Sequence, residues 1–163
     1  MSTSPEPDVA ASSTARRQWM AVLARTPRDA LKAAFDAALE GASAPAYDWL
    51  RAPDIGLAMV RGRIGGTGDA FNVGEVTVTR ATLRLKADEG STSVGVAVHM
   101  GRDKERATLA ALADALLQTP RYADRLQALL IEPLEARIAE ERRRKEAEAA
   151  STRVEFFTMV RGE

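Results

Sequence analysis

The stretch from Arg61 to Arg80 constrains the fold more than any other, because it reads as two strand-like runs joined by a glycine-rich turn. The turn is Gly65-Gly66-Thr67-Gly68, and glycine reaches positive φ without steric cost, so a tight connection is expected. Two interpretations fit it. The turn is a plain hairpin connection with its charges in solvent, or its backbone N–H groups and neighbouring arginines bind an oxyanion.

Three strand-like segments in succession predict an antiparallel meander. The segments are 55–64, 76–85 and 93–100, each with alternating apolar residues or many Thr and Val residues. Residues 88–90, Asp-Glu-Gly, are typical of a hairpin turn between the second and third strands.

Helical spacing marks both flanks of this sheet. We expect a first helix over 14–24 and a second one from Thr26, as N-cap, to a stop at Gly41. Residues 42–54 contain two prolines and are predicted to be an irregular connection. After the third strand, Asp103 is the expected N-cap of a helical segment that breaks near Pro133.

The last residues favour a strand that returns to the sheet. Over 152–160 apolar side chains fall on both faces, which is typical of a central strand or of an interface with another chain. The residues expected to contact a partner are Val154, Phe156, Phe157, Met159 and Val160. The predicted fold class is therefore α+β. It has an antiparallel sheet of three to four strands, N-terminal helices, and a C-terminal helical segment followed by a returning strand. Residues 1–13 are expected to be a disordered lead-in and 14–163 a single domain.

Composition excludes several classes of function. The chain has no cysteine and one histidine, so thiol catalysis, iron–sulfur ligation and a histidine-rich metal site are excluded. Lys+Arg and Asp+Glu number 23 each, and nucleic-acid binders need a basic excess, so no nucleic-acid partner is expected. No apolar run is long enough to span a membrane and no signal pattern is present, which favours the cytoplasm.

Basic residues and glycines cluster at the predicted strand ends, and they are the candidate oxyanion-binding residues. Several of them converging in a compact sheet would surround one phosphate-like group. They are Arg61, Arg63, Gly65, Gly66, Thr67, Gly68, Arg80, Arg102, Lys104 and Arg161. No phosphate loop, nucleophile elbow or paired-carboxylate signature is present, so no catalytic residue is assigned.

Five segments in order resemble one family. They are RQWMAVLA at 17–24, the run 56–85, GRDKERA at 101–107, LIEPL at 130–134 and RVEFFTMVRG at 153–162. In these segments the chain resembles the PhnG family, the small subunit of the bacterial carbon–phosphorus lyase core complex. One departure concerns the residues after the GRDK motif. The family often has His-Ala-Glu there, whereas this chain has Arg106, Ala107 and Thr108.

The resemblance implies a partner-dependent function. Members of the family work in a complex with subunits named PhnH, PhnI and PhnJ, in which methylphosphonate displaces adenine from MgATP. The product is α-D-ribose 1-methylphosphonate 5-triphosphate, and the iron–sulfur step belongs to PhnJ, so no cofactor is expected in this chain. We expect a non-catalytic or co-catalytic subunit. The alternatives are a subunit that binds the triphosphate or phosphonate directly, and an assembly or regulatory partner.

Overall fold

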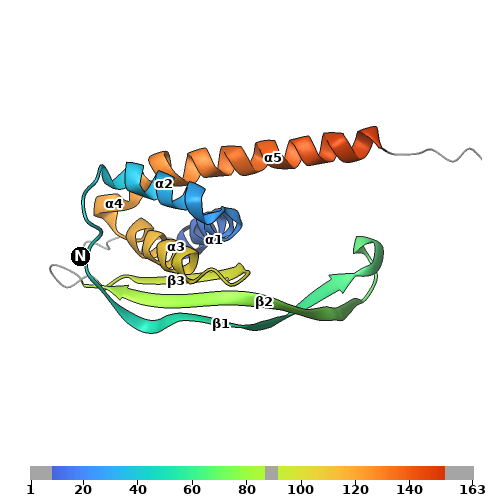
Figure 1. The fold of residues 1–163 in the computed structure, drawn as a ribbon, viewed down its shortest axis with the longest axis horizontal. Helices are drawn as coiled ribbons and strands as arrows, with labels where there is room; N and C mark the ends of the chain where they lie inside the picture. Colours follow the sequence, from blue (N-terminus) through green and yellow to red (C-terminus); the bar gives the residue numbers. More distant parts are fainter. Residues whose placement is uncertain (1–8, 87–91, 153–163) are drawn as a thin grey trace, which may run out of the picture.

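The computed structural model describes residues 9–86 and 92–152. It shows one three-stranded antiparallel sheet with strand order β1-β2-β3 and helices stacked over one of its faces (Figure 1). In chain order the elements are α1 (Val9–Arg25), α2 (Arg28–Leu39), β1 (Tyr47–Arg63), η1 (Ile64–Gly66), β2 (Ala70–Leu85), β3 (Val94–Met100), α3 (Lys104–Leu117), α4 (Pro120–Leu126), η2 (Gln127–Ile131) and α5 (Glu132–Ser151). The predicted α+β class and the meander are confirmed. The predicted returning strand lies outside the described residues.

The core lies between the sheet and α3. Alternate residues of β2, including Ala81 and Leu83, are fully buried, and α3 is buried along most of its length. A Cβ built at Gly95 of β3 would lie 1.8 Å from the carbonyl oxygen of Ala111, so only glycine allows α3 to approach this closely. This packing fixes one face of the sheet and leaves the other without a helical cover in the described ranges.

The ends of the first two helices differ from the prediction. α1 begins at Val9, so part of the predicted lead-in is helical. Thr26 does not cap α2, because its buried hydroxyl donates to the carbonyl oxygen of Val22 at 2.8 Å and Pro27 takes the N-cap position. α2 ends at Leu39, where Glu40 adopts the left-handed conformation one residue before Gly41.

Residues 47–54 are strand rather than irregular connection, which corrects the prediction for 42–54. The strand β1 shifts register between Trp49 and Arg51 and again between Arg51 and Asp54. Pro53 lies within the second irregularity, where the missing N–H of proline interrupts no regular ladder. The residues that favour a strand here are the aromatic Tyr47 and Trp49, two positions apart. Their rings pack edge to face, with the ring centroids 5.1 Å apart.

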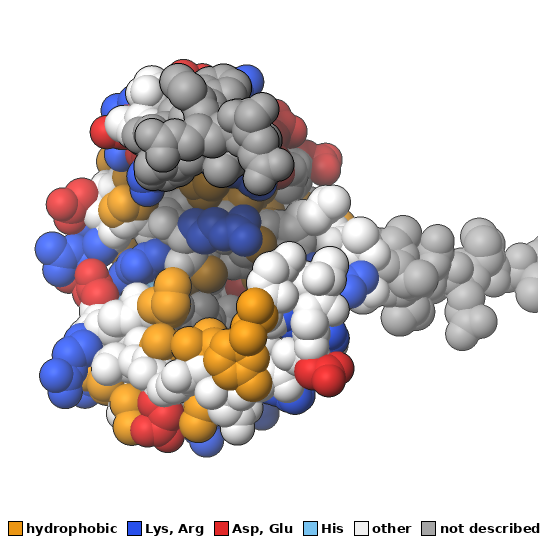
Figure 2. Space-filling view, turned by 90° about the vertical axis from the view of Figure 1, so that its right-hand side faces the viewer, with side chains coloured by type: hydrophobic (Ala, Val, Ile, Leu, Met, Phe, Trp, Pro, Cys, Tyr) orange, Lys and Arg blue, Asp and Glu red, His pale blue; other side chains and the backbone are white. Residues whose placement is uncertain are grey.

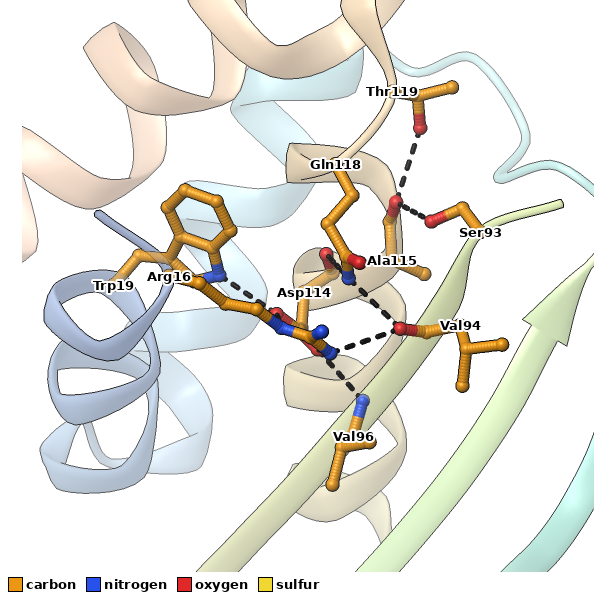
Figure 3. A network of polar contacts seen from close by, with 9 residues as sticks. All are labelled: Arg16, Trp19, Ser93, Val94, Val96, Asp114, Ala115, Gln118 and Thr119. Atoms are coloured by element: carbon orange, nitrogen blue, oxygen red, sulfur yellow. Dashed lines mark hydrogen bonds and ion pairs between the residues drawn. The ribbon is translucent and has the colours of Figure 1, made fainter. Parts of the chain in front are cut away.

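A buried carboxylate fixes α1 against α3 and β3 (Figure 3). Asp114 of α3 is fully buried, and it accepts hydrogen bonds from Arg16 at 2.7 Å and from the indole of Trp19 at 2.8 Å. It also accepts the backbone N–H of Val96 at 2.9 Å. One carboxylate therefore ties three elements together, and its charge is paired.

The C-terminal half follows the prediction at two points. Asp103 caps α3 by accepting the N–H of Arg106 at 2.9 Å. The expected break near Pro133 occurs as the π-helical turn η2, after which α5 begins with Pro133 in its first turn.

α5 and the β1–β2 hairpin both extend past α1–α4 toward the same side of the molecule (Figure 1).

Candidate functional site

The far end of the β1–β2 hairpin holds the glycine-rich turn. Gly65 and Gly66 have φ angles of 60° and 78°, and the N–H of Gly68 closes the turn on the carbonyl oxygen of Ile64 at 3.2 Å. The turn borders a shallow depression of about 400 Å³ lined by Arg61, Gly62, Arg63, Gly66 and Ala70. The structure thus places the glycines and two of the predicted arginines together.

Both arginines at this end also contact the turn itself. Arg63 donates to the carbonyl oxygen of Gly68 at 2.9 Å, and Arg61 donates to that of Ala70 at 3.5 Å. Both side chains are exposed, so their remaining N–H groups face solvent. The pair stiffens the turn and gives the end of the hairpin a positive charge.

Arg80 lies elsewhere. It sits opposite Asp54 in the sheet and forms an ion pair with it at 3.0 Å. It lies eight residues further along β2 than Asn72, the partner of Arg61, which separates them by about 26 Å in an extended strand. Arg80 therefore does not join Arg61 and Arg63 around one ligand.

Arg102 and Lys104 flank the start of α3, and both are exposed. The anion position at this helix N-terminus is already filled by the Asp103 carboxylate. Asp103 in turn lies 3.9 Å from Arg28, and the pKa of Arg28 is raised, chiefly by its hydrogen bond to Asp29 and then by the charge of Asp103. Arg161, the last predicted arginine, lies outside the described residues.

His99 and Arg106, which lie on either side of the GRDK motif at 101–104, both bond to backbone carbonyl oxygens. The ring nitrogens of the buried His99 lie 3.0 Å from the carbonyl oxygen of Met100 and 2.9 Å from that of Asp103. Arg106 donates to the carbonyl oxygen of Ala24 at 2.6 Å and so covers the end of α1. Burial lowers the pKa of Arg106, and the charge of Asp103 opposes that shift.

The hairpin carries most of the large hydrophobic side chains that the described part of the chain exposes. Leu57 is 61% exposed and Met59 51%, although both come from the middle of a strand. Figure 2 looks onto the far end of the hairpin and shows hydrophobic side chains gathered there, with Lys and Arg side chains in the hollow above them. The exposed set on the hairpin is Trp49, Leu50, Ile55, Leu57, Met59, Val60, Ile64, Phe71 and Val73.

A second hollow lies between α1 and α5. It has a volume of about 870 Å³, and its lining mixes Gln18, Arg25, Arg142 and Lys145 with Glu141 and small apolar residues. On α5 the pKa of Arg142 is raised, chiefly by its hydrogen bond to Glu146. Acidic and basic side chains both line this hollow, so it has no net positive charge that would favour an anion.

The sequence did not indicate the apolar hairpin as a surface. The segment 55–64 was predicted as a strand from its alternating apolar residues, among them Ile55, Leu57 and Met59, and the apolar face of a strand is normally covered. The structure shows that the hairpin extends past α1, α2, α3 and α4, on the same side of the molecule as α5 (Figure 1), and that this run is exposed in the described ranges. The predicted partner residues at 154–160 lie outside those ranges.

Residues 9–86 and 92–152 contain no group of three or more His, Asp or Glu side chains placed to hold a metal ion. None of the helices in those ranges is both long and apolar enough to cross a membrane.

The chain is similar to known proteins over most of its length. The family model described as phosphonate metabolism protein PhnG matches residues 14–162. A protein of Rhizobium meliloti (strain 1021), named α-D-ribose 1-methylphosphonate 5-triphosphate synthase subunit PhnG, is 49% identical over 148 residues. That alignment covers 91% of this chain and 90% of the relative.

Proposed function

The chain belongs to the PhnG family, and from that premise we propose that it is a non-catalytic or co-catalytic subunit of a synthase of the same kind as its relative's. The complex would use methylphosphonate to displace adenine from MgATP and give α-D-ribose 1-methylphosphonate 5-triphosphate. Its partners would be subunits of the PhnI, PhnH and PhnJ types, in the cytoplasm, where ATP is available. The role of this chain is to complete the assembly.

One observation carries this proposal: the projecting hairpin exposes apolar side chains that a solitary domain of this size would normally cover. Burying the exposed halves of Leu57 and Met59 against a partner contributes about 1 kcal/mol each. Several such residues together favour a stable interface.

The test is reconstitution of the synthase with and without this chain. The PhnI-, PhnH- and PhnJ-type subunits from the same source are co-expressed either with this chain or with an empty vector, and adenine release from MgATP is followed with methylphosphonate. Activity should fall at least about tenfold without the chain, a loss of about 1.4 kcal/mol of transition-state stabilisation. Full activity in its absence would refute the proposal.

A second candidate function is supported by the end of the hairpin. Arg61, Arg63 and the glycine turn offer charge and backbone N–H groups around one depression, a combination that fits a triphosphate or phosphonate oxyanion. A charge-assisted arginine contact contributes about 1.5–3 kcal/mol.

Arg63→Ala should therefore weaken MgATP or methylphosphonate binding by the complex by roughly ten- to a hundredfold, with the subunits still assembled. Binding is measured by calorimetry on the purified complex. Arg144→Ala, which removes an exposed arginine of α5, is the matched control and should change nothing. Unchanged binding in Arg63→Ala would exclude the direct role.

A further inference from the structure

The two edges of the sheet differ in whether side chains bond to their outward backbone groups. β1 and β3 are both edge strands, and an edge presents unpaired N–H and C=O groups to any other extended chain. On β3, the Val96 N–H is taken by Asp114 at 2.9 Å, and the Val94 carbonyl accepts from Arg16 at 3.1 Å and Gln118 at 2.9 Å (Figure 3). Side chains of the helical layer thus close the β3 edge along its first half.

Among the described residues, no side chain of the helical layer bonds to the edge of β1 in this way. Gly101 donates its N–H to the Thr77 carbonyl at 2.9 Å, so Thr77 turns its polar groups toward β3. Alternation then turns Val76 and Val78, and their partners Ala58 and Gly56, toward the β1–β2 ladder. Ile55, Leu57 and Met59 therefore direct their N–H and C=O groups outward, and within the described ranges no bond from outside the sheet reaches them.

The features that protect an edge lie on either side of this run, not in it. Two register shifts and Pro53 precede it, and Arg61 and Arg63 follow it. Between them residues 55–60 carry no charge and no proline. Their side chains are apolar on both faces, a pattern typical of a strand with a neighbour on each side.

We propose that an extended strand of another subunit of the complex adds to the β1 edge along Ile55, Leu57 and Met59, an inference that rests on the proposed function. The bonds are main-chain ladder bonds, and the partner strand is apolar in its middle with acidic residues near Arg51 and Arg63. A second copy fits poorly, because symmetric pairing centred on Leu57 sets Arg51 of one chain beside Arg63 of the other.

The test compares two variants at one position. Leu57→Pro removes the outward N–H but no bond to β2, and Gly56 before it has no Cβ to clash with the proline ring. Leu57→Thr also loses the apolar side chain but keeps that N–H, so it is the matched control. Each full chain is co-expressed with the PhnI-, PhnH- and PhnJ-type subunits, and the amount co-purified is measured. Leu57→Pro should be recovered about tenfold less than Leu57→Thr, as expected for one or two lost hydrogen bonds.

Amide hydrogen exchange identifies the occupant. In the isolated wild-type chain the amides of Leu57 and Met59 should exchange freely, and in the complex they should slow on the order of 100-fold. Three results would overturn the strand addition: equal recovery of the two variants, unchanged exchange in the complex, or protection already present in the isolated chain. If the isolated chain is already protected and the protection is independent of protein concentration, the strand on β1 is the chain's own C-terminal segment. If that protection rises with protein concentration, the strand belongs to a second copy of the chain. Failure of the wild-type chain to co-purify at all would instead refute the proposed subunit role.

Discussion

At the scale of single residues, Asp114 shows how one charge organises the helical layer. It lies in a run of alanines and leucines, and such an acid is tolerated in a core only with partners. Its carboxylate is fully buried while its partner Arg16 is 34% exposed. The sequence signals that a partner is needed, but Arg16, Trp19 and Val96 are distant in the chain, so packing alone identifies them.

Replacing this carboxylate should be costly. Asp114→Ala leaves the Trp19 indole and the Val96 N–H without an acceptor, so the free energy of unfolding should fall by about 3 kcal/mol. Urea denaturation followed by circular dichroism measures it. The control is Asp36→Ala, which removes the exposed partner of Lys32 and should change stability by less than about 0.5 kcal/mol. Equal effects of the two substitutions would show that the network contributes nothing.

At the scale of elements, periodicity predicted the meander, the glycine turn and the Asp103 cap, because each depends on a few neighbouring residues. It missed the first eight residues of β1, since Pro45 and Pro53 outweighed the aromatic alternation of Tyr47 and Trp49. Periodicity also could not predict which of the arginines lie close together in the fold. Whether Arg80 meets Arg61 depends on strand length and register, and the register puts Arg80 beside Asp54 instead.

The long hairpin is the element with the clearest functional consequence. Its base packs under α3, whereas its outer half extends past α1–α4, on the same side of the molecule as α5 (Figure 1). The sequence could not show this, because a strand has the same alternation whether or not a helix covers it. The two sheet edges also differ, since side chains of the helical layer bond to part of the β3 edge, whereas no described side chain bonds to the middle of the β1 edge.

At the scale of the whole molecule, the chain combines a well-packed body with a projecting apolar arm. The body provides stability, and the arm provides a surface that a partner would bury. That division fits a subunit of an assembly, and it agrees with the family to which the chain belongs. The proposed anion-binding role of Arg61 and Arg63 would be a separate property, because it depends on the end of the hairpin and not on its middle.

Native mass spectrometry of the co-expressed complex tests the central claim most directly. The wild-type chain is compared with the double variant Leu57→Asp, Met59→Asp, which places charges where both side chains are more than half exposed. Such charges scarcely alter the isolated fold but are unpaired in an interface, which costs several kcal/mol. The account predicts that the wild-type chain is present at a fixed ratio to the other subunits and that the folded double variant is absent. Recovery of the double variant at the wild-type ratio would contradict it.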